Sequence, residues 1–187
     1  MKKAYLFLAT GFEEIEAIAT IDILRRGGVE LITVSITGER KVMGVHQIPV
    51  TADFLFEDVD FSDGDAFILP GGGPGSFMLN EHEALKQLLI CKNEQNKWIA
   101  AICAAPLVLG GLGLLEGKKA ICYPGMESYI HGAVLTDAPV VTDGNIITGK
   151  GPGLALNFGL TILAALHGQD IADKVANDLL VKKSLIS

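Results

Sequence analysis

Cys103 is the residue of this chain best placed to do chemistry. It follows an apolar run, Trp98–Ile102, that is typical of a buried strand, and it precedes Ala104, where the first turn of a helix is predicted. A tight strand-to-helix turn holds its side chain at the sheet edge with unpaired helix N–H groups facing it, which is the geometry of a nucleophile elbow. That end of a helix favours negative charge and therefore a thiolate. A buried structural cysteine explains this stretch equally well, because free cysteine is among the most buried residue types.

Two other predicted strands end in unusual residues. The strand at 3–9 runs into Glu13, Glu14 and Glu16, and the strand at 66–69 runs into the glycine-rich loop Pro70–Gly75. In an open α/β sheet, functional groups collect in the crevice beyond the carboxyl ends of the parallel strands. We therefore expect Glu16 to approach Cys103. For Glu13 and Glu14 we favour the ordinary explanation, which is the attraction of acids to a helix N-terminus.

A charged Glu16 beside a Cys103 thiolate would raise the pKa of one group or of both. The two coexist only if they share a proton, with Glu16 neutral and donating a hydrogen bond to the sulfur. The glycine loop alone is a weak signal, because it lacks the spacing of dinucleotide and phosphate loops. Beside a cysteine elbow, however, the N–H groups of Gly72 and Ala104 could form an oxyanion hole. This combination indicates acyl- or carbonyl-type chemistry.

The remaining polar candidates carry weaker signals. None of the histidines, which are His46, His82, His131 and His167, receives a catalytic assignment from its spacing. The segment 151–153 ends one predicted strand and opens a helix, so Pro152 could wall the same crevice, although a structural turn is the more ordinary explanation.

Strands and helices alternate along the whole chain. Strands are expected at 3–9, 29–36, 66–69, 98–102, 119–122, 140–142 and 145–148, and helices at 14–26, 83–96, from 104, 153–166 and 170–182. The segment 38–53 is expected to be irregular or a hairpin, and 140–148 a hairpin. This alternation predicts one domain spanning 1–187, built as an α/β three-layer sandwich with a mostly parallel sheet.

Composition excludes several classes of function. The net charge is −7, from 15 basic and 22 acidic residues, and the largest basic cluster is Lys182-Lys183, so nucleic-acid binding is not expected. No apolar stretch is long enough to cross a bilayer, and the short apolar start meets acidic residues at once, so we interpret it as a strand of a cytoplasmic protein. Three cysteines without CxxC spacing predict neither a disulfide framework nor a metal site, and no cofactor is expected.

Taken together, the segments GFEEIEAI, FILPGGGPG, AAICAAP, CYPGMES and TGKGPG, in this order, resemble the ThiJ/PfpI family, in the branch that includes a Parkinsonism-associated protein. The resemblance implies a flavodoxin-like (class I glutamine amidotransferase-like) sandwich, usually a homodimer. It also implies a nucleophilic cysteine at Cys103, a protonated glutamate at Glu16 and backbone donors at Gly72 and Ala104. The substrate-contacting positions on this interpretation are Gly71, Tyr123 and Pro152.

Two departures from the family pattern bear on function. The protease-like branch has histidine directly after the cysteine, where this chain has Ala104, which argues against a peptidase. Some relatives carry histidine at the position of Tyr123, and a phenol with a pKa near 10 is a poorer proton shuttle at neutral pH. His46, in a segment that lies near the dimer interface in relatives, is the candidate for a contribution from a partner subunit.

Two hypotheses follow. In the first, the chain is a cofactor-free glyoxalase or deglycase, a lyase or hydrolase whose Cys103 thiolate adds to a small carbonyl substrate or a glycated adduct. In the second, it is a redox sensor or stress chaperone controlled by oxidation of the same cysteine. An amidotransferase or peptidase on this fold is a third and less favoured interpretation.

Overall fold

A seven-stranded sheet forms the centre of the computed structural model, which describes residues 1–181. Its strands are β1 (Lys3–Leu8), β2 (Glu30–Ser35), β5 (Phe54–Leu55), β6 (Ala66–Leu69), β7 (Trp98–Ile102), β10 (Val140–Asp143) and β11 (Ile146–Gly149). Their order is β10-β11-β7-β6-β1-β2-β5, and every pairing is parallel except that of β10 with β11. The buried strands are apolar on both faces, as expected when helices cover both sides.

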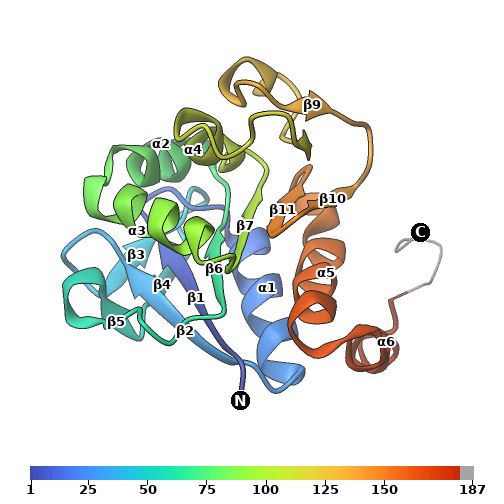
Figure 1. Cartoon of the computed structure of the whole chain (residues 1–187). Coiled ribbons are helices and arrows are strands. Elements are labelled where there is room, and N and C mark those ends of the chain that lie inside the picture. The colour runs from blue at the N-terminus through green and yellow to red at the C-terminus, as the bar shows by residue number, and fades with distance from the viewer. Residues whose placement is uncertain (182–187) are drawn as a thin grey trace.

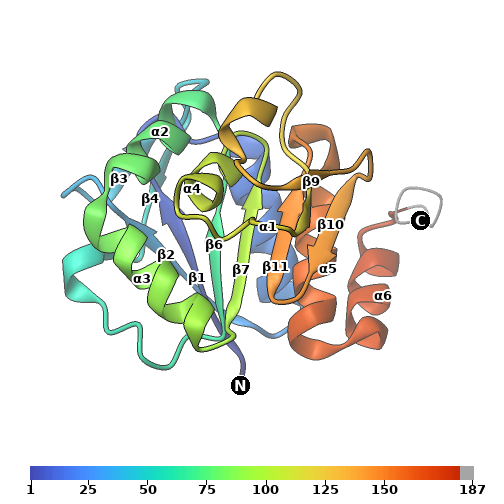
Figure 2. The same cartoon turned by 45° about the horizontal axis from the view of Figure 1, so that its top comes forward.

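The helices form two layers around this sheet, as Figures 1 and 2 show. One layer holds α1 (Glu14–Arg26), α5 (Ala155–His167) and α6 (Gln169–Asp178); the other holds α2 (Gly73–Glu81), α3 (Glu83–Glu94) and α4 (Pro106–Gly111). Alternate β1 side chains serve the two cores, because Leu6 and Leu8 pack on the α1 side and Tyr5 and Phe7 on the other. The predicted three-layer α/β sandwich is confirmed.

Several elements differ from the sequence prediction. Helix α2 was not predicted, because its first turn, Gly73-Pro74-Gly75, has low helix propensity. The segment 38–53, expected to be irregular or a hairpin, does contain a hairpin, formed by β3 (Lys41–Met43) and β4 (Pro49–Thr51). The strand expected at 119–122 is only β8 (Lys119–Ala120), which pairs with β9 (Val134–Leu135) outside the main sheet. The last helix ends at Asp178; the expected end at Lys182 and the Lys182-Lys183 pair lie outside the described residues.

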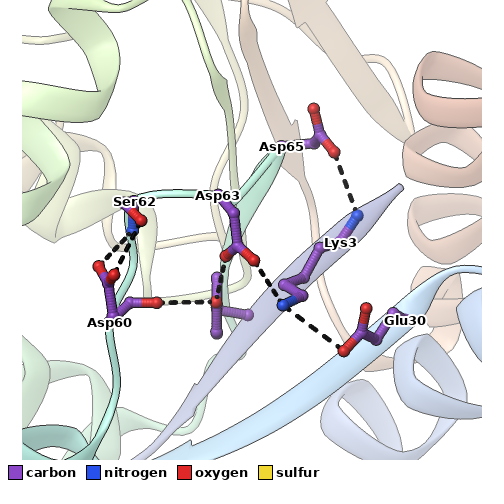
Figure 3. A network of polar contacts seen from close by, with 7 residues as sticks. Lys3, Glu30, Asp60, Ser62, Asp63 and Asp65 are labelled. Atoms are coloured by element: carbon purple, nitrogen blue, oxygen red, sulfur yellow. Dashed lines mark hydrogen bonds and ion pairs between the residues drawn. The ribbon is translucent and has the colours of Figure 1, made fainter. Parts of the chain in front are cut away.

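A polar network joins the amino ends of the central strands (Figure 3). Lys3 Nζ lies 2.6 Å from Asp63 and 3.5 Å from Glu30, and the Lys3 N–H donates to Asp65 Oδ2 at 3.1 Å. The Tyr5 hydroxyl donates to Asp63 at 2.8 Å. These contacts hold the start of β6 beside β1, at the sheet edge opposite to the carboxyl ends. No helix within residues 1–181 has the length and apolar character needed to span a bilayer.

Candidate active site

Cys103 stands directly after β7 in a backbone conformation that is unusual for a residue with a side chain. Its φ is 65°, in the left-handed region, which costs on the order of 1–3 kcal/mol for a non-glycine residue. Hydrogen bonds on both sides hold this geometry: the Cys103 N–H donates to Gly149 O at 2.9 Å, and its carbonyl accepts from Tyr123 N at 2.8 Å. The strand therefore turns sharply toward α4 at Cys103, as an elbow requires.

Glu16 is fully buried in the first turn of α1 and lies against this elbow. Its Oε2 accepts a hydrogen bond of 2.7 Å from the N–H of Gly71. Its other oxygen, Oε1, is buried and makes no hydrogen bond of good geometry within residues 1–181. A neutral carboxyl group with an O–H to donate fits such a position better than a carboxylate.

The acidities of Glu16 and Cys103 are linked. Burial raises the pKa of Glu16 to about 7, against the opposing effect of hydrogen bonds with the Cys103 side chain and the Gly71 N–H. Burial, followed by the charge of Glu16, raises the pKa of the Cys103 thiol to about 12. Protonation of Glu16 removes that opposing charge, so the two groups titrate as a pair.

The glycine loop after β6 brings backbone donors to the sulfur. Hydrogen bonds from the N–H groups of Gly72 and Ala104 lower the pKa of Cys103, so both groups face the thiol. Gly72 has a φ of 91°, which only glycine adopts readily. Gly71 permits close packing, because a Cβ there would lie 2.5 Å from Glu16 Oε2 and 2.6 Å from Cys103 Cβ.

A crevice of about 530 Å³ opens over Cys103 at the carboxyl ends of the strands. Of the positions predicted to contact substrate, Tyr123 and Pro152 line it, whereas Gly71 is absent from its lining and donates its N–H to Glu16. The lining residues are Glu13, Ile15, Val45, His46, Gly72, Gly73, Cys103, Ala104, Tyr123, Met126 and Pro152. The entrance is therefore largely apolar, with a carboxylate and an imidazole on one side.

The sequence did not reveal the pairing of Glu14 with His46. Glu14 Oε1 accepts hydrogen bonds from the N–H groups of His46 and Ile48 at 2.7 and 3.3 Å, and Glu14 Oε2 lies 3.0 Å from His46 Nδ1. These contacts bring the β3–β4 turn of the same chain to the crevice mouth. Glu13 joins the group, because its Oε2 lies 3.6 Å from His46 Nδ1.

The other cysteines have different surroundings. Cys91 is exposed on α3, where Gln95 Nε2 donates to its sulfur at 3.2 Å. Cys122 is buried in the opposite core from Cys103, and burial followed by the charge of Glu127 raises its pKa to about 11. Neither sulfur lines the crevice.

Comparisons with known proteins match the chain to one family. The model of the DJ-1/PfpI family matches residues 2–165. Protein DJ-1 homolog B of Arabidopsis thaliana is 38% identical over 183 residues, which cover 97% of this chain and 42% of the plant protein. The chain thus spans less than half the length of that relative.

Solved structures are similar over nearly the whole chain. The C103A mutant of a DJ-1 superfamily protein from Salmonella typhimurium aligns with a TM-score of 0.93 and 38% identity, covering 97% of this chain and 100% of the other. Toxoplasma gondii DJ-1 in an oxidized form aligns with a TM-score of 0.92 and 35% identity, covering 96% and 98%.

Proposed function

Because this chain belongs to the DJ-1/PfpI family, we propose that it is a cofactor-free enzyme of the glyoxalase or deglycase type, acting on small reactive dicarbonyls or their adducts through Cys103. The observation that carries this proposal is the Cys103 elbow. Its sulfur faces two backbone N–H groups and a buried carboxyl group beneath an open crevice. These groups suit the addition of a thiolate to a carbonyl carbon.

The reaction with methylglyoxal illustrates the chemistry. The Cys103 thiolate forms an S–C bond to the aldehyde carbon, and the carbonyl electron pair moves to oxygen, where the N–H groups of Gly72 and Ala104 stabilise the charge. That oxygen takes a proton, for which Glu16 is the donor. The C–H proton is removed and returned to the neighbouring carbon, and the hydroxyl proton passes to the oxygen on that carbon, which gives a thioester. Water then releases lactate and the thiolate, and Glu16 regains its proton. One water is consumed, and the substrate is both oxidised and reduced.

The direct test is to incubate the purified protein with methylglyoxal and to assay lactate. The proposal expects multiple turnovers without added metal, thiol or nucleotide. A protein that yields no lactate beyond a protein-free control is not this enzyme.

A second function, redox sensing by Cys103, rests on the same sulfur, which lines the crevice. The oxidized state of the Toxoplasma gondii relative favours this alternative. A thiolate reacts with peroxide where a thiol does not. Burial and the charge of Glu16 raise the pKa of Cys103, the N–H groups of Gly72 and Ala104 lower it, and a protonated Glu16 would remove the opposing charge.

We expect limiting peroxide to modify Cys103 before Cys91 or Cys122 and to leave a stable sulfinate as the main product. With no other cysteine sulfur lining the crevice to resolve the sulfenic acid, a second oxidation follows. Glu16→Gln, a weaker donor, should slow sulfinate formation or divert it to the sulfonate. Peptide mapping by mass spectrometry measures the products. Earlier modification of Cys91, or an intramolecular disulfide, would contradict this expectation.

We also propose that the chain acts as a cytoplasmic homodimer. Large exposed apolar side chains on α1 and the adjoining hairpin support an association surface, namely Ile15, Ile18 and Ile48. Burial of such residues stabilises a dimer at about 25 cal/mol per Å² of apolar surface, before the costs of association. Analytical ultracentrifugation measures the state directly.

A further inference from the structure

His46 stands at the mouth of the crevice in a fixed position. Its backbone N–H is held by Glu14 Oε1 at 2.7 Å, and Val45 N donates to Phe12 O at 2.9 Å, which ties the turn to the start of α1. A Cβ at Gly44 would overlap the Glu14 carboxylate, so the turn packs tightly on this side chain. The imidazole therefore belongs to the rigid wall of the site, although its side chain is 67% exposed.

The contact with Glu14 also determines which ring nitrogen carries the proton. Glu14 is buried and accepts N–H bonds from the turn, and these bonds and the bond from His46 lower its pKa against the effect of burial, so it stays charged. A charged carboxylate 3.0 Å from Nδ1 requires a proton on that nitrogen. The neutral ring then leaves Nε2 as a proton acceptor, and Nε2 has no hydrogen-bond partner within the described part of the chain. A carboxylate on one ring nitrogen and a free second nitrogen is the arrangement of a general base.

We propose that His46 is a second catalytic proton-transfer residue, which accepts at Nε2 the C–H proton of substrate bound to Cys103 and returns it to the neighbouring carbon. The inference rests on the proposed dicarbonyl reaction. That reaction needs a base after the S–C bond has formed. Glu16 is assigned to the proton of the oxygen, and its Oε2 already accepts the N–H of Gly71. His46 and Cys103 line the same crevice. Glu14 is the positioning residue for the imidazole.

The charged groups that face His46 are Glu14 and Glu13, both at the start of α1. They raise its pKa, first through the hydrogen bond that His46 donates to Glu14 and then through the charge of Glu13. A base works only when deprotonated, so kcat/KM should fall at pH values below this pKa. Glu14→Gln removes the largest cause of the increase. In Glu14→Gln, the fall of kcat/KM on the acidic side of its pH profile, the acidic limb, should therefore move to lower pH.

The experiment compares wild type, His46→Gln and the matched control His131→Gln, which changes an exposed loop histidine. We expect His46→Gln to lower kcat for methylglyoxal about 100-fold, the usual range for loss of a general base, with little change in KM. Alkylation of Cys103 by iodoacetamide should proceed at the wild-type rate, because the base acts after the sulfur has reacted. The control should match wild type, and the backbone N–H that pins the turn is kept in the variant.

Three outcomes overturn the inference, and they are distinguishable. If wild type forms no lactate, the proposed function fails and the role of His46 fails with it. If wild type is active and His46→Gln keeps its kcat and its acidic limb, only the role of His46 is lost. If His46→Gln slows alkylation of Cys103 as much as turnover, the imidazole acts on the thiol or on the local structure rather than on the substrate.

Discussion

Cys103→Ala is expected to lower the rate of lactate formation from methylglyoxal on the order of 10³-fold or more, because it removes the atom that forms the covalent bond. In related covalent mechanisms, removal of a nucleophile that acts together with its partners lowers the rate by at least this factor. The alanine keeps the apolar contacts of the site, and its N–H can still donate to Gly149 O. Loss of activity should therefore not reflect unfolding, which circular dichroism checks.

The matched control for this variant is Cys91→Ala, which removes an exposed thiol from α3. It should turn over at the wild-type rate. Wild-type turnover in Cys103→Ala would instead move the chemistry to another residue and remove the basis of the proposed function.

Glu16→Gln is expected to stabilise the folded protein more at pH 8 than at pH 5. Burial raises the pKa of Glu16 to about 7 from its ordinary value of 4.5, so between these pH values the folded state holds this proton where the unfolded state has lost it. The contribution of this proton to the free energy of unfolding is fully present below about pH 4.5 and is lost as pH rises through 7. The total loss is roughly 3 kcal/mol. Glutamine stays neutral and escapes this loss, and its amide preserves an acceptor for the Gly71 N–H.

Urea unfolding at the two pH values measures this difference, in the Cys103→Ala background so that the thiol does not titrate with Glu16. An equal effect of Glu16→Gln at pH 5 and pH 8 would show that the carboxyl group is not held neutral by its surroundings. In the presence of Cys103, the same substitution should also suppress lactate formation, because glutamine cannot give up a proton to the oxyanion.

Much of the site was predictable because local patterns specify it. The apolar runs of β1, β6 and β7 predict parallel neighbours, and parallel strands place their carboxyl ends on one edge, so the approach of Glu16 to Cys103 followed from topology. The elbow was visible as a strand that meets a helix at Cys103. The positive φ of Cys103 was not predictable, because β-turn and helix propensities of its neighbours do not require it.

The rest depends on contacts between segments distant in sequence. Glu14 and His46 are 32 residues apart in the sequence. The β3–β4 turn that carries His46 has no sequence periodicity that would place it over α1. The attraction of acids to a helix N-terminus already explains an acid at position 14, so nothing in the sequence indicates that Glu14 holds the turn. Helix α2 forms despite its glycines because Gly11 and Gly75 allow the loop and helix to pack closely, a property of the tertiary structure alone.

The pH dependence of Cys103 alkylation tests the central claim most directly. Iodoacetamide is applied between pH 4 and pH 10, and the rate of modification is read for the Cys103 and Cys91 peptides separately by mass spectrometry. If Glu16 and Cys103 share a proton so that the sulfur is a thiolate at neutral pH, the Cys103 rate rises below pH 7 and then stays level, and Glu16→Gln abolishes that plateau. A Cys103 rate that is negligible at pH 7 and still rising at pH 10 would show a buried thiol that holds its proton, and would contradict the account.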